Sequence, residues 1–502
     1  TEGNDGLKAE KAYVLGGSVN LVGGDKGKAS TCDICDGKTK LQPTKVTLVD
    51  DKGKGYAVIS SNEIWSFSEV CMGEVYAKLT EEDEVIAISY SFFGDNLIPV
   101  DVNGEALDDC ILCTDPRGVE EADYINSQIP AKDQRDSIGD CYMPYKFGAK
   151  ALWVKKHAPY AANVAYYDSQ QQYVFRKLGL PPVNDYTMAA RKQLLELESG
   201  TWDQRFLNVL GITPEQLGLW IVPTGDIVGY ITSYGNVDLG KKLPVIAGGH
   251  DCDVAMIGMG LIDENVDAVG DITGTFDHVG YLADRPVNLK KNDETTPLVS
   301  YNGPFPGSSV CLGAFPTAGA TLEWFMREMN EGTSGADYNK YWSRVQFDGK
   351  GSVMVMPTLD GGRGRIDGIS VTTTKADLFK AVIEALTFEN RRLIEDCAKV
   401  KRGQVKRVRI GGGAANSDEW MQLRADISGV TVERMKNIQI SSLGGAILAA
   451  VAVGEYPDLQ TAVDCMVHIG DVFTPNEEVR KKYEEKYGLY NKRRAEAEKG
   501  LF

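Results

Sequence analysis

Strand-like and helix-like segments alternate along the 502-residue chain, and this alternation restricts its fold more than any other feature. Residues 12–120 contain short apolar runs separated by Gly, Asp and Asn turns, as expected for strands. Residues 140–240 are mainly helical in pattern, and the alternation resumes with a strand expected at residues 243–247. Such alternation is typical of α/β proteins. We therefore predict two α/β domains, residues 1–245 and 246–502.

The charge balance and the cysteine content exclude several classes of protein. The formal net charge is −17, and so acidic a surface repels nucleic-acid phosphates and anionic lipid headgroups. The sequence contains no run of about 18 apolar residues, which a membrane-spanning helix needs. Its ten cysteines are too few for a disulfide scaffold. We expect a cytoplasmic protein that binds neither nucleic acid nor membranes and has a small-molecule ligand.

Two Cys-x-x-Cys pairs, at residues 32–35 and 110–113, suggest zinc as one alternative, because four thiolates can hold the ion tetrahedrally. The two pairs are much farther apart than the roughly 15–20 residues usual in such a site. The second pair also lies in an apolar run typical of a buried strand, where cysteine acts as a small hydrophobic residue. We therefore favour a structural role for these cysteines.

Four loops are richer in glycine and polar residues than ordinary connections. The first has the sequence Gly-Gly-His-Asp at residues 248–251, directly after the strand expected at residues 243–247. A carboxylate at the end of a strand in an α/β protein points into the crevice where ligands bind. Asp251 is therefore a candidate general base toward a hydroxyl group. The alternative is that Asp251 only caps the helix that follows.

The second and third loops contain candidate contacts for a phosphate or a nucleotide. Gly274 and Thr275, in the turn at residues 270–276, offer N–H and hydroxyl groups to an anion, and a plain β-hairpin is the simpler alternative. Residues 409–416 place three glycines between a strand and a helix, where a nucleotide can approach the backbone. The candidate residues of this third loop are Gly411, Gly412, Gly413 and Asn416.

The fourth loop follows the strand expected at residues 110–114 and contains Asp115 and Arg117. An aspartate and an arginine on a tight turn can hydrogen-bond substrate hydroxyls. They can equally pair with each other on the surface, which is the default for such residues.

The order and spacing of these loops resemble those of the FGGY family of carbohydrate kinases. The resemblance extends over roughly residues 56–490, nearly the whole chain. A collinear series of this kind is a more specific signal than any single glycine-rich loop. The matching segments are residues 101–107 with 114–117, 245–260 with 273–275, 357–364 with 381–388, and 410–429 with 443–449.

This resemblance implies a two-domain fold of the actin and hexokinase type, with a ribonuclease H-like core in each domain and a cleft between the domains. It implies ATP-dependent phosphorylation of a small sugar or polyol, with a ketopentose such as xylulose as the first candidate. The N-terminal domain would bind mainly the sugar, and the C-terminal domain mainly ATP with Mg²⁺. Homodimers are common in that family.

The family's functional residues fall on positions in the loops described above. Its catalytic base falls on Asp251, and its phosphate-binding turn on Gly274 and Thr275. Its adenosine-binding loop falls on Gly411, Gly412, Gly413 and Asn416. For the sugar we assign His250, Asp115, Arg117 and Tyr90. Tyr90 lies with Phe92 and Phe93 where family members carry residues that select the sugar, and the alternative is that two of these aromatic residues belong to the core.

The chain departs from the family pattern after its first strand. Family members have an Asp-x-Gly-Thr hairpin there, which helps to hold magnesium and the ATP phosphates, whereas residues 16–27 have no such motif. Gly16, Gly17 and Ser18 can still donate N–H groups to phosphate, and Asp25 can replace the lost carboxylate. The alternative is a family member with weakened catalysis that binds sugar or nucleotide as a regulatory protein.

Overall fold

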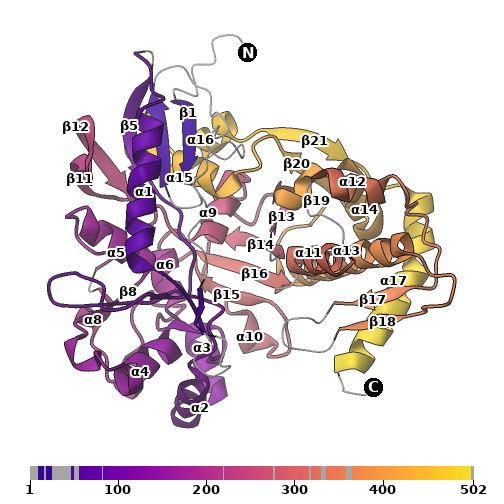
Figure 1. Cartoon of the computed structure of the whole chain (residues 1–502), viewed down its shortest axis with the longest axis horizontal. Helices are drawn as coiled ribbons and strands as arrows, with labels where there is room; N and C mark the ends of the chain where they lie inside the picture. The colour runs from indigo at the N-terminus through magenta and orange to yellow at the C-terminus, as the bar shows by residue number, and fades with distance from the viewer. Residues whose placement is uncertain are drawn as a thin grey trace. The chain divides into compact units, whose positions relative to one another are not determined.

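The computed structural model of the chain divides into two compact units (Figure 1). The first unit comprises Thr1–Asp263, Leu282–Cys311 and Gln439–Val467, and the second comprises Glu264–Tyr281, Leu312–Ile438 and His468–Phe502. A single cut after residue 245 therefore does not divide the chain as its internal contacts do. The structure describes residues 9–15, 19–24, 47–49, 56–81, 83–218, 220–274, 277–315, 318–329, 335–357 and 364–498.

The first unit is built on a sheet in the order β1-β2-β5-β12-β11. Strand β12 pairs in parallel with β5 and antiparallel with β11, while β1 and β2 form an antiparallel hairpin in which Leu15 pairs with Val19. Residues 16–18, which join the two strands of that hairpin, and Asp25 lie outside the described residues. The strands are β1 (Ala9–Leu15), β2 (Val19–Gly24), β5 (Glu84–Ser89), β11 (Ile227–Tyr234) and β12 (Val237–Ile246).

Shorter strands and twelve helices complete the described part of the first unit. The strands are β3 (Thr47–Val49), β4 (Tyr56–Ile59), β6 (Ile98–Val100), β7 (Cys110–Ile111), β8 (Tyr166–Asp168), β9 (Asn184–Asp185), β10 (Ile221–Val222) and β15 (Val299–Asn302). The helices are α1 (Ser61–Tyr76), α2 (Val119–Gln128), α3 (Ala131–Ile138), α4 (Phe147–His157), α5 (Gln170–Lys177), α6 (Tyr186–Arg191), α7 (Gln204–Leu210), α8 (Pro214–Leu217), α9 (Asp251–Gly258), α10 (Leu289–Asn292), α15 (Ile440–Ala452) and α16 (Leu459–Met466).

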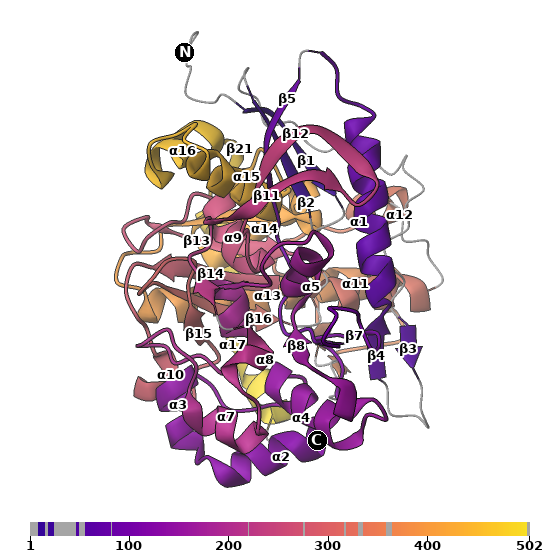
Figure 2. The ribbon, with the colours of Figure 1, turned by 90° about the vertical axis from the view of Figure 1, so that its left-hand side faces the viewer.

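Helix α1 covers one face of the first unit's sheet, and it runs along the strands in both views (Figures 1 and 2). Its side chains Met72 and Val75 are fully buried. They belong to one apolar cluster with Ile88 of β5 and Val245 of β12. This packing fixes the end of β12, from which the first candidate loop begins, and the end of β5, which the aromatic stretch at residues 89–94 follows.

The second unit is built on a sheet in the order β16-β14-β13-β19-β20-β21. Strands β13 and β14 form an antiparallel hairpin, whereas β13, β19 and β20 are parallel neighbours. The ends of β13 and β19 therefore carry the second and third candidate loops side by side. The strands are β13 (Ala268–Thr273), β14 (Asp277–Ala283), β16 (Ser309–Phe315), β17 (Met354–Met356), β18 (Arg365–Asp367), β19 (Arg407–Gly412), β20 (Thr431–Met435) and β21 (Ile469–Phe473).

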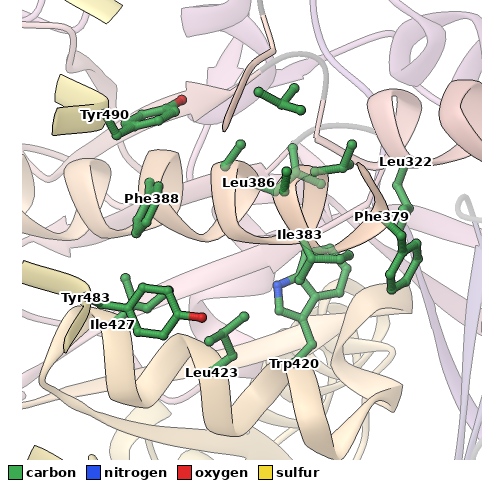
Figure 3. Close-up of a cluster of buried hydrophobic side chains, with 14 of the residues drawn as sticks. Leu322, Phe379, Ile383, Leu386, Phe388, Trp420, Leu423, Ile427, Tyr483 and Tyr490 are labelled. Atoms are coloured by element: carbon green, nitrogen blue, oxygen red, sulfur yellow. The ribbon is translucent and has the colours of Figure 1, made fainter. Parts of the chain in front are cut away.

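Helices α13 and α14 form the core of the second unit together with α17 (Figure 3). Trp420 of α14 points toward Ile383 of α13, and its indole N–H donates a hydrogen bond to Thr387 Oγ1 at 3.0 Å. Thr374 and Asp377 form a capping box that defines the start of α13, and the helix is 26 residues long. The helices are α11 (Ala318–Glu328), α12 (Gly335–Trp342), α13 (Lys375–Val400), α14 (Asp418–Ser428) and α17 (Glu477–Glu498).

Two segments differ from the elements that the sequence pattern predicts. Within the region expected to be mainly helical, residues 140–240, helix α6 ends at Arg191, because Gln193 adopts a left-handed φ of 55° and Leu195 pairs with Trp202 in a β-bridge. Strand β11 lies in a region expected to be helical. It pairs along its length with β12, and this long-range partner cannot be read from local periodicity.

Helices α9 and α15 lie close together in the first unit although almost 200 residues separate them in the sequence. A Cβ atom added to Gly258 would overlap the carbonyl oxygen of Ile440, and one added to Gly444 would overlap that of Val254. The two backbones therefore touch where their glycines meet. This contact explains why residues 439–467 belong to the first unit.

We predict that Gly258→Ala lowers the free energy of unfolding by about 1–3 kcal/mol, since a methyl group forces α9 away from α15. Urea denaturation followed by circular dichroism measures the change. Gly488→Ala is the control, because Gly488 is an exposed helical glycine of α17 with no atom within 4 Å of an added Cβ. That variant should gain about 0.5–1 kcal/mol. Equal stability of wild type and Gly258→Ala would contradict the close contact.

Candidate active site

Two glycines set the direction of the chain between β12 and α9. A Cβ atom on Gly248 would overlap the carbonyl oxygen of Tyr90. Gly249 has a φ of 128°, and a Cβ atom there would lie 2.8 Å from Thr187 Oγ1. No side chain fits at either position. The chain therefore turns sharply at the end of the strand, and Asp251 becomes the first residue of α9.

Backbone hydrogen bonds hold this turn against the loop that follows β5. The N–H of Phe92 donates to the carbonyl of Gly249 at 2.8 Å, and the N–H of Asp251 donates to the carbonyl of Phe92 at 2.8 Å. The N–H of His250 donates to Thr187 Oγ1 at 2.8 Å. These bonds fix the backbone on both sides of the Asp251 side chain.

Asp251 is the accessible member of a group of charged side chains. Its side chain is 41% exposed, against 10% for His250 and 1% for Asp253. The N-cap of α9 is His250, so the alternative of Asp251 as the cap of this helix does not describe the structure. The Asp251 carboxylate instead accepts the N–H of Cys252 at 2.7 Å within the first turn, where the helix dipole favours negative charge.

Four residues that the sequence analysis did not select lie around this turn. The ring of His250 lies against Gly94, and Asp95 follows with a left-handed φ of 55°. Lys146 Nζ lies 3.8 Å from Asp95 Oδ1 and donates to the Tyr301 hydroxyl at 3.2 Å. These residues are Asp95, Lys146, Arg191 and Tyr301. Only Asp95 had a sequence signal, since it directly follows the aromatic stretch at residues 89–94.

A second buried lysine stabilises the same loop. Lys150 Nζ donates to the carbonyls of Leu112, at 2.9 Å, and of Asp95. Burial lowers the pKa of Lys150 to about 8, and the Asp95 carboxylate counteracts part of that effect. Burial lowers the pKa of Lys146 too, but Asp95 together with Tyr301, Tyr145 and Asp140 outweighs burial and holds that pKa above its usual range.

Tyr90 is a core residue. It is fully buried, and its ring stacks on that of Phe92 with centroids 5.3 Å apart. Phe93 is only partly buried and packs against the apolar cluster that contains Tyr90 and Phe92. The alternative in which two of the three aromatic residues are core therefore describes the structure, and a sugar contact by Tyr90 is not supported.

Asp115 and Arg117 form an internal ion pair rather than a surface pair. The Asp115 carboxylate is fully buried and accepts the Ala57 N–H at 2.7 Å and the Arg117 guanidinium at 2.8 and 2.9 Å. The Arg117 guanidinium also lies over the rings of Tyr56 and Trp153. Both Asp115 oxygens are thus occupied within the chain, which favours a structural role over direct contact with sugar.

The cysteine and histidine residues offer a poor zinc site. Cys110 lies in β7, and burial raises its pKa to about 12. Cys32 and Cys35 lie outside the described residues. Within the described residues, one group of three potential ligands has its atoms within 4.8 Å of one another, namely His250, Asp251 and Cys252. Burial holds the Cys252 pKa well above its usual range, so its thiol stays protonated.

In the second unit, the glycines of the third candidate loop differ in their surroundings: Gly412 is packed against a neighbouring strand and Gly413 is open. Gly412 has a φ of 106°, and a Cβ atom there would overlap the Thr273 carbonyl on the neighbouring strand. Gly413 is exposed, and no atom lies within 4 Å of the position of its Cβ. Asn416 is exposed as well, and its Nδ2 donates to the Gly413 carbonyl at 3.1 Å. Gly411 is buried at the end of β19.

The second candidate loop is the turn between β13 and β14, as the hairpin alternative predicted. Gly274 is exposed, and its carbonyl accepts the N–H of Gly319 in α11 at 3.2 Å. Thr275 lies outside the described residues. Gly274 and Gly413 follow strands that are paired in parallel, so both exposed glycines lie at one edge of the second unit's sheet.

One buried arginine fixes both strands of this hairpin. Arg424 of α14 contacts Asp271 of β13 and donates to Asp277 Oδ2 of β14 at 2.9 Å. Asn390 Nδ2 donates to Asp271 Oδ2 at 2.8 Å. Burial raises the pKa of Asp271 to about 7, although Arg424 counteracts the effect, and nearby Asp277 adds to the rise. The shared guanidinium therefore holds the two ends of the turn at a fixed separation.

The chain belongs to the FGGY family of carbohydrate kinases, whose N-terminal domain matches residues 23–258 and whose C-terminal domain matches residues 290–453. It is similar to a xylulose kinase of Staphylococcus epidermidis, with 28% identity over 462 residues that cover 87% of this chain and 88% of the relative. It is also similar to a glycerol kinase of Lactobacillus acidophilus, with 27% identity over 357 residues that cover 68% of this chain and 70% of the relative.

A solved structure confirms the predicted fold. The crystal structure of gluconate kinase from Lactobacillus acidophilus superimposes with a TM-score of 0.81, covers 97% of this chain and 98% of its own, and is 21% identical in sequence. The two-domain α/β fold of FGGY kinases is therefore that of this chain. As a member of this family, the chain catalyses ATP-dependent phosphorylation of an alcohol group of a carbohydrate. Among the helices of the described residues, none is long and apolar enough to cross a membrane.

Proposed function

We propose that this kinase transfers the γ-phosphoryl group of ATP to a hydroxyl of a small sugar or polyol, with Asp251 as the general base. The observation that supports this proposal is the contrast in burial at the start of α9. Asp251 presents an accessible carboxylate on a rigid backbone, while the charged groups beside it are buried and paired. Phosphoryl transfer needs mainly positioning and charge neutralisation, and a fixed carboxylate supplies the first of these.

A ketopentose such as xylulose is the first candidate substrate. A xylulose kinase, a glycerol kinase and a gluconate kinase are all similar to this chain, and at these identities none of the three substrates is preferred by similarity alone. The neighbourhood of Asp251 contains both an acidic group, Asp95, and a basic one, Lys146, which together suit a neutral polyhydroxyl compound better than an acid.

Mg²⁺ accompanies ATP in this proposal, since a divalent cation neutralises the charge of the phosphates. The group of His250, Asp251 and Cys252 suits this ion poorly, because Mg²⁺ prefers oxygen ligands and the group contains a single carboxylate. We therefore assign none of the described residues to magnesium.

The alternative function, a sugar- or nucleotide-binding regulatory protein, is favoured by one observation, the absence of Asp-x-Gly-Thr at residues 16–27. The homodimer and the cytoplasmic location stay predictions.

The test of this function is ADP release by the purified chain with ATP, Mg²⁺ and a panel of xylulose and other ketoses, glycerol and other polyols, and gluconate. We expect sugar-dependent ADP release with the highest kcat/KM for a ketopentose. No ADP release with any compound of the panel, from protein that still binds nucleotide, would favour the regulatory alternative. A maximum with glycerol or gluconate would keep the kinase and overturn the ketopentose assignment.

Asp251→Asn should lower kcat by about 10²–10⁴-fold, because an amide cannot accept the proton of the attacking hydroxyl. The dissociation constant for ADP, measured by isothermal titration calorimetry, should not change. Asp123→Asn is the control, since it makes the same substitution at an exposed position of α2. Turnover of Asp251→Asn at the wild-type rate would place the base elsewhere.

Gly413→Ala should weaken ATP binding by about tenfold, or about 1.4 kcal/mol, without loss of stability. The reason is that the added methyl group meets no protein atom and occupies space beside the exposed loop. Gly412→Ala should instead lower the free energy of unfolding by about 1–3 kcal/mol through backbone strain and overlap with β13. Calorimetric ATP titration and urea denaturation separate the two effects. Undiminished ATP affinity of Gly413→Ala would remove this loop from the nucleotide site.

A further inference from the structure

A chain of polar contacts leads from the Asp251 carboxylate into the interior of the first unit. His250 Nε2 lies 3.3 Å from Asp251 Oδ1, and His250 Nδ1 lies 2.5 Å from Asp253 Oδ2. The same Asp253 oxygen accepts a hydrogen bond from Arg191 Nη2 at 2.8 Å. One imidazole ring thus lies between an accessible carboxylate and a buried one.

The imidazole ring has little freedom to turn. A Cβ atom on Gly94 would lie 2.7 Å from His250 Cδ2 and 2.9 Å from Nε2, so the ring packs directly on the Gly94 backbone. The Thr187 hydroxyl accepts the N–H of His250. The Thr187 hydroxyl and backbone N–H in turn both donate to the buried Asp185 carboxylate. The ring orientation is therefore set before any ligand binds.

The buried carboxylate of Asp253 also sets the position of the ring proton. Burial by itself raises the pKa of Asp253, but the ion pair with Arg191 and the hydrogen bond from His250 lower it below its usual range. Asp253 is therefore ionised and can only accept, so Nδ1 of the ring is the donor. In the neutral ring, Nε2 then carries a lone pair directed at the Asp251 carboxylate.

We propose that His250 is a positioning residue that orients the Asp251 carboxylate and takes over the proton that this carboxylate accepts, with Asp253 and Arg191 fixing the ring. The inference rests on the proposed role of Asp251 as base. The substrate hydroxyl loses its proton to Asp251 as its oxygen bonds to phosphorus and the bond to ADP breaks. The Asp251 carboxyl then donates that proton to His250 Nε2. The resulting imidazolium lies between two carboxylates, and the proton afterwards passes to solvent.

Charged and titratable groups surround the ring on several sides. The titratable and charged groups that face His250 or its partners include Asp251, Cys252 and Asp253 from α9, Arg191 from α6, Tyr301 from β15, and Asp95 from the loop after β5. Of these, the Cys252 thiol is protonated, and Arg191 is already paired with Asp253. The Asp251 carboxylate becomes ionised again when it passes the proton on, and it then lies 3.3 Å from the protonated Nε2 as a counter-ion.

The first test is Asp253→Asn. Asparagine keeps an oxygen that can accept from both Arg191 Nη2 and His250 Nδ1, but it removes the negative charge beside the ring and so weakens the ring as an acceptor of the proton held by Asp251. We expect kcat to fall by about 10²–10⁴-fold, with the KM for sugar and the dissociation constant for ADP unchanged. Asp168→Asn is the matched control, since Asp168 is also fully buried and paired with an arginine, Arg176, but lies in β8. That control should keep kcat.

The second test is chemical rescue of His250→Ala, which does not depend on the folding of Asp253→Asn. Imidazole and substituted imidazoles of different basicity are added at fixed concentration, and ADP release is measured with the best sugar of the panel. We expect rescued turnover to increase with the basicity of the added imidazole, because a better proton acceptor takes the proton more readily. A residue that only fills space would give rescue that depends on size and not on basicity.

The outcomes separate this inference from the proposed function. A kcat of Asp253→Asn equal to that of Asp168→Asn, or rescue independent of basicity, would overturn the role of His250 and leave Asp251 as base. Full activity of Asp251→Asn would overturn the base itself and the inference with it. Loss of activity in Asp251→Asn, together with basicity-dependent rescue of His250→Ala, supports both.

Discussion

The contact between the β12–α9 turn and the loop after β5 is the interaction on which the first unit's site depends. Gly248 and Gly249 let the backbone pass so close to Tyr90 and Thr187 that no side chain fits between them. Two backbone–backbone hydrogen bonds and one from the His250 N–H to the Thr187 hydroxyl then fix the start of α9. Asp251 needs no rearrangement to present its carboxylate, and such preorganisation is what a phosphoryl-transfer enzyme requires of its base.

In the second unit, a buried ion pair holds the candidate loop in place. Arg424 crosses from α14 to both strands of the β13–β14 hairpin, so a helix in the core determines the separation of the strands that carry the turn. Gly412 brings β19 against Thr273, and this contact leaves Gly413 exposed at the edge of the sheet. Two glycines that look equivalent in the sequence thus serve packing and access respectively.

Sequence reasoning predicted what local chemistry determines. The strand–glycine–helix junctions at residues 248–251 and 409–416 follow from short-range patterns, and both are present. The partners of Asp251 could not be predicted in the same way. Arg191, which fixes the neighbouring Asp253, lies 62 residues before it in the sequence and reaches it only through the fold. The burial of Asp115 depends on the Ala57 backbone, a contact across 58 residues. The local periodicity of apolar residues does not indicate such long-range contacts.

We propose that phosphoryl transfer to sugar survives in a chain whose first hairpin, β1–β2, lacks the family's Asp-x-Gly-Thr motif. The most direct measurement is the fate of the γ-phosphate in a single turnover, with ATP labelled at that position and the full chain in excess. The account predicts that the label appears in sugar phosphate, with little in inorganic phosphate. Label found only in inorganic phosphate, or left in ATP while sugar and nucleotide are both bound, would contradict it.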